Sequence, residues 1–195
     1  MNDYFYIPRY PPLPKGPFAI VLADCPWQYD NGGVPQAGVN AQYSTLSIDD
    51  LKKLPINEIT YANSILFAWA TFPKLPEALE VIKAWGFKYK TLGFSWIKTN
   101  KDGSPFFGVG YYAKSNCEVC LMATKGKGGS KTSYLPVISN KVSSCVITQK
   151  RRHSSKPPEV RNRIVELFGD VPRIELFARS TCEGWASWGL EVENC

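Results

Sequence analysis

Short apolar runs of strand length alternate along this chain with segments of helical period, and this alternation constrains the fold most. The runs that we predict to be strands are residues 18–23, 64–70, 91–97, 118–123, 142–147 and 173–178. The first of them is almost continuously apolar, as expected of a strand that is covered on both faces. Strands that alternate with helices indicate an α/β fold with a mostly parallel sheet.

Three segments carry the signals of helices. Residues 47–55 begin with Ser47 as a cap, have Asp50 three positions further on and stop at Pro55. Residues 73–86 and 157–168 repeat apolar side chains at helical spacing and end at, or just before, a glycine. The side chains that we expect on their buried faces are Leu75, Leu79, Ile82, Trp85, Val160, Ile164 and Phe168.

The chain of 195 residues is most simply one domain. Residues 1–15 are rich in proline and predict an extended arm, and residues 16–195 predict a single folded domain. The chain has no apolar run of the roughly 18–20 residues that a membrane span needs, and its first residues do not resemble a signal peptide. We therefore expect no membrane partner.

Positive charge is concentrated in two loop-like segments. The net charge is +6, and both "KGKGGSK" (125–131) and "KRRH" (150–153) are basic. Such segments are often no more than solvated faces, but they also suit contacts with phosphate backbones. Nucleic acid is therefore a candidate partner.

The cysteines do not indicate a metal site. Nothing suggests secretion, so reduced thiols are expected rather than disulfides. Cys117 and Cys120 have the spacing of half a zinc site, but no second pair accompanies them and His153 is the sole histidine. In a strand, thiols three positions apart also face opposite ways.

The first strand ends in Asp24-Cys25-Pro26-Trp27, at the place where open α/β sheets bind ligands. Asp24 can be a simple turn residue and Trp27 a core aromatic. The same groups also suit an amino group on an aromatic ring, whose lone pair is delocalised into the ring. If Asp24 and the carbonyl of Cys25 or Pro26 each accept one N–H, the lone pair turns toward an electrophile. Trp27 would then offer a flat face for the base.

Asp-Cys-Pro-Trp resembles the Asp-Pro-Pro-Trp motif of the MT-A70-like family of adenine-N6 methyltransferases, of the prokaryotic and phage DNA type. The resemblance continues in family order from about residue 16 to residue 191, through "YSTLSIDDL", "ILFAWA", "EALEVIKAWGFKYKTLGFSWIKTN", "HSSKPPEVRNRIVELFG" and "RIELFARSTCEGWASWGLE". It implies a Rossmann-like methyltransferase fold with helices on both faces of the sheet. It also implies that the catalytic motif precedes the cofactor motif, which accounts for the lack of a G-x-G-x-x-G loop.

The resemblance implies S-adenosylmethionine as the cofactor and assigns roles to residues. The motif Asp24, Cys25, Pro26 and Trp27 would hold the target adenine, with Asp24 also close to the methionine end of the cofactor. Lys156 would reach the cofactor carboxylate, although alone it would be taken for an exposed lysine at a helix start. The remaining cofactor candidates are Arg179, Thr181, Leu190 and Glu191, of which Glu191 would accept from the ribose hydroxyls. The substrate-side candidates are Tyr43, Trp96, Lys98, Glu118, Lys125, Lys127, Lys131, Arg151 and Arg152.

The expected substrate is adenine in DNA, either flipped out of the helix or single-stranded. DNA is preferred to RNA because a short chain resembles the prokaryotic and phage members, and the expected location is the cytoplasm of a prokaryotic or phage-infected cell. Specificity would come from loops or from a second subunit, so a homo- or hetero-oligomer stays open. The alternatives are the same reaction on RNA, a non-catalytic nucleic-acid-binding subunit, and a methyltransferase for a small amine or a protein amide.

One residue departs from the family motif. Cys25 stands where the family has its first proline. If the acceptor at that position is the backbone carbonyl, the side chain is not needed and activity should survive.

Overall fold

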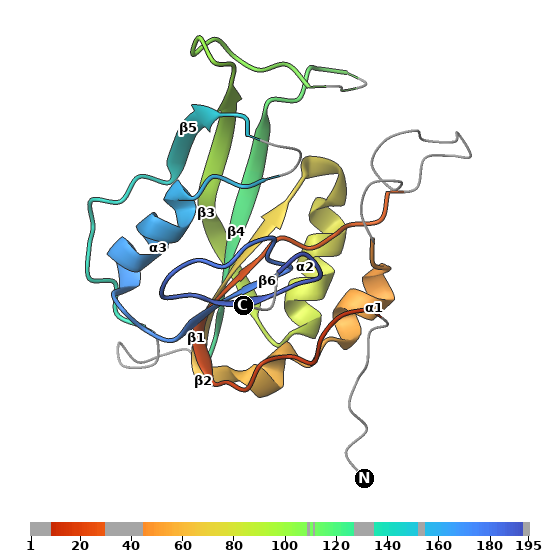
Figure 1. The fold of residues 1–195 in the computed structure, drawn as a ribbon, viewed down its shortest axis with the longest axis vertical. Coiled ribbons are helices and arrows are strands. Elements are labelled where there is room, and N and C mark those ends of the chain that lie inside the picture. Colours follow the sequence, from red (N-terminus) through yellow and green to blue (C-terminus); the bar gives the residue numbers. More distant parts are fainter. Residues whose placement is uncertain are drawn as a thin grey trace.

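Seven strands form one sheet in the order β5-β3-β4-β2-β1-β6-β7 (Figure 1). The computed structural model describes residues 9–29, 45–108, 110, 112–126, 135–151 and 155–192. The strands are β1 (Phe18–Ala23), β2 (Thr60–Ala70), β3 (Lys88–Thr99), β4 (Cys117–Lys125), β5 (Cys145–Gln149), β6 (Arg173–Leu176) and β7 (Ala186–Trp188). The helices are α1 (Ile48–Lys53), α2 (Leu75–Ala84) and α3 (Glu159–Phe168), with short 3₁₀ turns η1 (Ile56–Ile59) and η2 (Phe72–Lys74).

The sheet is mostly parallel, as the alternation of strands and helices predicts. β1 pairs in parallel with β2 and β6, β3 with β5, and β6 with β7. β4 is the exception, because it runs antiparallel to both β2 and β3. The carboxyl ends of the other strands therefore meet at one edge of the sheet, and β4 begins there.

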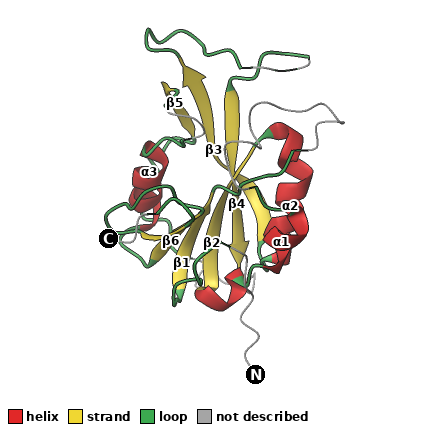
Figure 2. Cartoon of the chain, turned by 45° about the vertical axis from the view of Figure 1, so that its right-hand side comes forward, coloured by secondary structure: helices red, strands yellow, loops and turns green. Residues whose placement is uncertain are grey.

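Helices cover both faces of the sheet, which confirms that expectation. Figure 2 shows α3 on one side of the strands and α1 and α2 on the other. Successive residues of β1 divide between two apolar clusters, with Val21 and Ala23 on the side of α1 and α2 and Ile20 and Leu22 on the side of α3. This division explains why β1 is apolar at every position.

The helix signals are confirmed, with one change of buried face. Ser47 caps α1, since its hydroxyl oxygen accepts a hydrogen bond from the backbone N–H of Asp50. Gly169 ends α3 with a φ of 78°, a conformation that glycine adopts without strain. Leu79 is wrongly predicted, because its side chain is 37% exposed. The stripe that α2 buries consists of Ala78, Val81, Ile82 and the following Trp85.

Several strands differ from the sequence expectation. β2 begins at Thr60 rather than at residue 64, and β3 spans Lys88–Thr99 rather than residues 91–97. β5 begins at Cys145, three residues after the predicted start at residue 142. β7 was not predicted, because it has only three residues and Ser187 interrupts its apolar character. It pairs with β6, which places the segment after residue 177 beside the end of β1.

The described part of the N-terminal segment lies against the end of the chain. Tyr10 is buried between the rings of Phe177 and Trp188. The indole N–H of Trp188 donates a hydrogen bond of 2.8 Å to the carbonyl of Pro11. None of the described helices is long and apolar enough to cross a membrane.

Candidate active site

A pocket opens at the edge of the sheet where the parallel strands end. Its walls come from the segments that follow β1, β2 and β6, from the start of β4 and from the residues before α3. Nine residues that the sequence singled out line it: Asp24, Cys25, Pro26, Trp27, Glu118, Lys156, Arg179, Leu190 and Glu191. The structure therefore brings together the motif after β1 and the residues near the end of the chain.

Lys156 links two carboxylates at the base of this pocket. Its ammonium nitrogen lies 2.8 Å from Oδ1 of Asp24 and 3.1 Å from Oε2 of Glu118. Lys98 binds the other oxygen of Glu118. All four side chains are largely buried, with 12–20% of each exposed. Two ammonium groups thus face two carboxylates, and the cluster is electrically balanced.

The surroundings shift the pKa values of this cluster in different directions. Burial raises the pKa of Asp24 above that of an ordinary aspartate, although the charge of Lys156 opposes the shift. Burial also acts to raise the pKa of Glu118, but Lys156 and Lys98 together hold that pKa below its ordinary value. For Lys156, burial alone would lower the pKa, and the two carboxylates raise it instead. Lys156 therefore stays protonated, and the pKa values of the two carboxylates move in opposite directions from their ordinary values.

The backbone of the Asp24–Trp27 turn is held by two hydrogen bonds. The N–H of Trp27 donates to the carbonyl of Cys25 at 2.9 Å, and the N–H of Leu46 donates to the carbonyl of Pro26 at 3.0 Å. Each carbonyl oxygen has two lone pairs, so either can accept a second hydrogen bond. The two carbonyls proposed as acceptors are thus fixed in place before a substrate arrives.

The side chain of Cys25 packs in the core, although Cys25 is also one of the residues that line the pocket. Its side chain is 4% exposed and belongs to the apolar cluster under α1 and α2. Burial, followed by the nearby charge of Asp24, raises the pKa of its thiol well above the ordinary value. The side chain at this position thus behaves as a small apolar group, which agrees with the expectation that only its backbone takes part.

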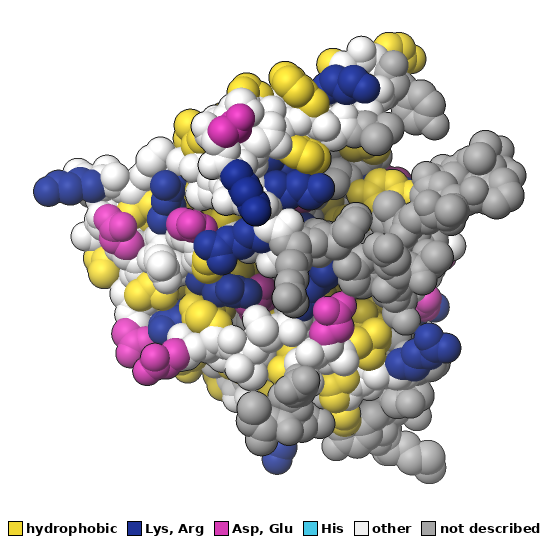
Figure 3. Space-filling view, turned by 45° about the horizontal axis from the view of Figure 1, so that its top comes forward, with side chains coloured by type: hydrophobic (Ala, Val, Ile, Leu, Met, Phe, Trp, Pro, Cys, Tyr) yellow, Lys and Arg dark blue, Asp and Glu magenta, His cyan; other side chains and the backbone are white. Residues whose placement is uncertain are grey.

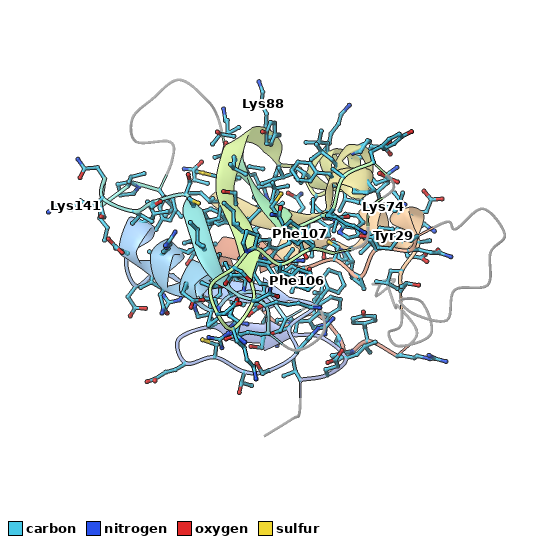
Figure 4. All side chains as sticks on the ribbon, turned by 90° about the horizontal axis from the view of Figure 1, so that it is seen from above. Tyr29, Lys74, Lys88, Phe106, Phe107 and Lys141 are labelled. Carbon is cyan, nitrogen blue, oxygen red and sulfur yellow. The ribbon has the colours of Figure 1, made fainter. Side chains whose placement is uncertain are left out.

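Two aromatic residues that sequence reasoning missed also line the pocket. The hydroxyl of Tyr29 lies 2.7 Å from Oγ1 of Thr71, and Lys74 lies 5.5 Å from the centre of its ring (Figure 4). The buried ring of Trp69 lies 5.7 Å from the ammonium of Lys156. Trp69 lies inside the predicted strand 64–70, near the end at which ligands were expected, and Tyr29 lies two positions after Trp27, so the position of each in the sequence was the available signal.

The end of the chain reaches the pocket through a sharp turn after β6. Phe177 adopts a φ of 59°, and Arg179 follows it. Nε of Arg179 lies 4.0 Å from Oε1 of Glu191, so the two side chains lie next to each other in the wall of the pocket. Gly189 makes this approach possible, because a Cβ at that position would lie 2.2 Å from the carbonyl oxygen of Ala178. Thr181 is exposed and does not line the pocket.

Other predicted residues lie outside the pocket. Trp96 is buried in the core, where its N–H donates to Oγ1 of Thr148 and its ring lies beneath Lys98. Arg151 is exposed and lines a neighbouring pocket together with Asp24 and Lys156. Tyr43, Lys127, Lys131 and Arg152 lie outside the described residues.

Lys125 is at the far edge of the sheet rather than beside the other candidates. Its ammonium binds the carbonyl of Asn57 and the hydroxyl of Thr60, at the start of β2. The reason is the direction of β4, which begins next to the pocket at Glu118 and runs away from it. Lys125 therefore does not line the pocket.

The family model of MT-A70 matches residues 18–191, which include the pocket residues after β1 and after β6. The chain belongs to the MT-A70 family. The type II methyltransferase M.MunI of Mycoplasma sp is 30% identical to it, and the match covers 95% of this chain and 82% of that protein.

Longer members of the MT-A70 family match this chain over one part of their length. The human N(6)-adenosine-methyltransferase catalytic subunit METTL3 is 26% identical over 92% of this chain and 29% of its own length. The human N(6)-adenine-specific methyltransferase METTL4 is 28% identical over 90% of this chain and 37% of its own length.

Proposed function

We propose that this protein is a site-specific DNA methyltransferase that transfers the methyl group of S-adenosylmethionine to N6 of adenine. The observation that carries the proposal is the carboxylate of Asp24, which Lys156 holds at the mouth of the turn Asp24–Trp27 in a chain of the MT-A70 family. We assign residues 16–195 to one Rossmann-like domain with the catalytic motif ahead of the cofactor motif, and residues 1–15 to a proline-rich arm.

The chemical groups of the pocket fit S-adenosylmethionine. Lys156 and Arg179 are cations suited to its carboxylate, and Glu191 offers acceptors for two ribose hydroxyl groups. When bound, the cofactor supplies a methyl group that its positively charged sulfur makes electrophilic. Asp24 lies beside Lys156 and so faces the same end of the pocket.

The turn after β1 would hold the amino group of the target adenine. Lys156 occupies one oxygen of Asp24, and a carboxylate has further acceptor sites for an N–H of adenine. The carbonyl of Cys25 or Pro26 would accept the second N–H, and Trp27 and Tyr29 provide aromatic walls for the base. Positioning then accounts for most of the rate acceleration. Asp24 is also placed to receive the proton that N6 releases, since burial raises its pKa.

DNA is supported as the substrate by how much of each relative this chain covers. M.MunI, named a type II methyltransferase, shares 82% of its length with this chain, whereas METTL3 shares 29%. The greater coverage favours a likeness to the type II methyltransferase over one to the longer relatives. The target adenine would reach the pocket by leaving the duplex or by being single-stranded.

Methyl transfer from labelled S-adenosylmethionine tests the proposal. The protein is incubated with unmodified duplex DNA, single-stranded DNA and RNA, and each product is digested to nucleosides. We expect N6-methyldeoxyadenosine from DNA, and Asp24→Ala to lower turnover at least about 10³-fold because the amino group loses its main acceptor. Asp49→Ala is the matched control, since it removes an exposed carboxylate of α1. Label in RNA alone would reassign the substrate, and full activity of Asp24→Ala would refute the mechanism.

A further inference from the structure

The loop between β3 and β4, of which residues 100–108, 110 and 112–116 are described, extends from the end of the sheet (Figure 1), and it returns to the sheet next to Glu118, which lines the pocket. It leaves the sheet two residues after Lys98 and returns two residues before Glu118, and these two side chains bind each other. The N–H of Lys98 also donates to the carbonyl of Asn116 at 2.8 Å. Anything held in the pocket and extending outward therefore meets this loop.

Internal hydrogen bonds give the described part of the loop a defined shape. The N–H of Asn100 donates to the carbonyl of Ser104, and Asp102 accepts hydrogen bonds from the N–H and the hydroxyl of Ser104. Further along, the N–H of Gly108 donates to the carbonyl of Ser115 at 2.7 Å. The loop is thus a built structure that presents its side chains in set directions.

That structure displays aromatic rings toward solvent. Phe107 is 65% exposed and Tyr112 is fully exposed. The neighbouring Phe106 is half-buried, its ring lies under the ammonium of Lys150 at 4.4 Å, and its N–H is fixed to the carbonyl of Lys98. Figure 4 shows Phe106 and Phe107 near the centre of the face that carries the pocket edge. Among the described residues, Phe107 belongs to neither apolar cluster, so packing within this part of the chain does not explain its exposure.

The loop and the segment beside it carry several cations, of which Lys150 lies over the ring of Phe106. Lys101 and Lys114 belong to the loop, and Lys150 and Arg151 follow β5 beside it. The acidic residue of the loop, Asp102, is engaged by Ser104. Figure 3 shows Lys and Arg side chains gathered in the middle of this face, with hydrophobic side chains next to them. Rings interleaved with cations suit a chain of bases and phosphates better than an apolar protein surface, in whose core charged residues are depleted.

We propose that the described part of this loop, residues 100–108, 110 and 112–116, forms a nucleic-acid-binding wing, in which Phe107 stacks on an unpaired DNA base next to the target adenine and Lys150 contacts the backbone phosphates. The inference rests on the proposed function, because an unpaired base beside the pocket arises when an adenine enters it. Stacking tolerates any base, since every base has a flat face, so this contact would add affinity without reading sequence.

Substitution of Phe107 tests the stacking. Binding of a short fluorescein-labelled single-stranded DNA is followed by anisotropy, and Phe107→Ala should weaken it roughly tenfold. Phe107→Trp should bind as tightly as the natural protein, because it keeps a flat ring. The matched control is Tyr61→Ala, which removes an exposed ring at the start of β2, the opposite edge of the sheet. Calorimetry with S-adenosylmethionine should give the same affinity for all four proteins.

A second variant tests the phosphate contact. Lys150→Gln should reduce the slope of log affinity against log salt concentration by about one, as expected when one phosphate contact is lost. Lys52→Gln, on the exposed surface of α1, should leave the slope unchanged.

The outcomes separate this inference from the proposed function. If the protein methylates DNA and Phe107→Ala binds and turns over normally, the wing is wrong and the enzyme stands. If no nucleic acid is methylated but Phe107→Ala weakens DNA binding, the contact between Phe107 and DNA stands, whereas the enzyme and the place of that contact beside a target adenine are wrong. A protein that binds no DNA, or a Phe107→Ala variant that changes only the oligomeric state in light scattering, overturns the wing.

Discussion

Two groups of buried ion pairs lie close together, one of which includes Asp24, and they are built differently. Arg161 of α3 binds Glu175 of β6 through two parallel contacts, Nε to Oε2 at 2.6 Å and a terminal nitrogen to Oε1 at 2.8 Å. Lys156 instead divides one ammonium between Asp24 and Glu118, with a single contact to each. Both groups border the neighbouring pocket that Arg151 also lines, so they share the same surroundings.

The difference separates a structural contact from a functional one. The planar fork of an arginine occupies both oxygens of Glu175, which fixes α3 on the sheet and leaves little capacity for another ligand. The ammonium of Lys156 has no fixed plane and contacts one oxygen of Asp24 and one oxygen of Glu118, while Lys98 binds the second oxygen of Glu118. The Arg161–Glu175 pair is thus rigid, and the cluster around Lys156 is adjustable. We expect substitutions in the pair to lower mainly the free energy of unfolding, and substitutions in the cluster to weaken mainly cofactor binding.

The largest effect on folding should come from breaking the rigid pair. Arg161→Ala leaves the buried carboxylate of Glu175 without its partner, so the free energy of unfolding should fall by about 3–5 kcal/mol. Urea denaturation followed by circular dichroism measures it. The control is Arg163→Ala. Arg163 lies two residues further along the same helix, and its guanidinium donates hydrogen bonds to the backbone carbonyls of Ser143 and Cys145. A loss below about 1 kcal/mol would show that the pair is not what holds α3 in place.

Breaking the adjustable cluster should chiefly weaken cofactor binding. Lys156→Gln removes the cation proposed for the cofactor carboxylate, and the dissociation constant of S-adenosylmethionine should rise about 10- to 100-fold. Isothermal calorimetry measures the constant, with Lys52→Gln as the exposed control. Unchanged affinity would assign Lys156 to Asp24 and Glu118 alone.

The smallest effect should appear in the pH profile. Asp24 must be ionised to accept an N–H, and its pKa is raised by burial, so kcat/KM should fall on acidification at a higher pH than an ordinary aspartate titrates. The charge of Glu118 contributes to that rise. Glu118→Gln should therefore move the acidic limb to lower pH, by less than about one unit. Glu80→Gln on α2 should not move it, and a shift to higher pH in Glu118→Gln would contradict the coupling.

Local patterns predicted the elements that depend on local chemistry. β1 was predicted with its observed bounds because it is buried on both faces, and α1 because Ser47 can bond the N–H of Asp50. Leu79 was misassigned because two apolar stripes fit the same helical period, and packing against the sheet chose between them. β7 is too short to leave a pattern and forms only because β6 offers an edge.

The site was predicted as a set of residues but not as an arrangement. The family resemblance pointed to Asp24, Lys156 and Arg179, and all three line the pocket. It did not indicate that Lys156 bridges Asp24 and Glu118, because that contact joins segments far apart in the chain. Lys125 was grouped with them by charge, and the reversed direction of β4 carries it to the other edge.

The position of β1 in the sheet sets an order of events during synthesis of the protein. β1 is made first and pairs with β2 on one side, but its other neighbour, β6, ends at Leu176. Until the ribosome has released that strand, one edge of β1 stays open to solvent, with Asp24 at its end. The ring of Tyr10 likewise cannot pack against Trp188 until that residue has been synthesised. A nascent chain therefore carries an unpaired apolar edge for most of its translation, a stage at which chaperones would find a binding site.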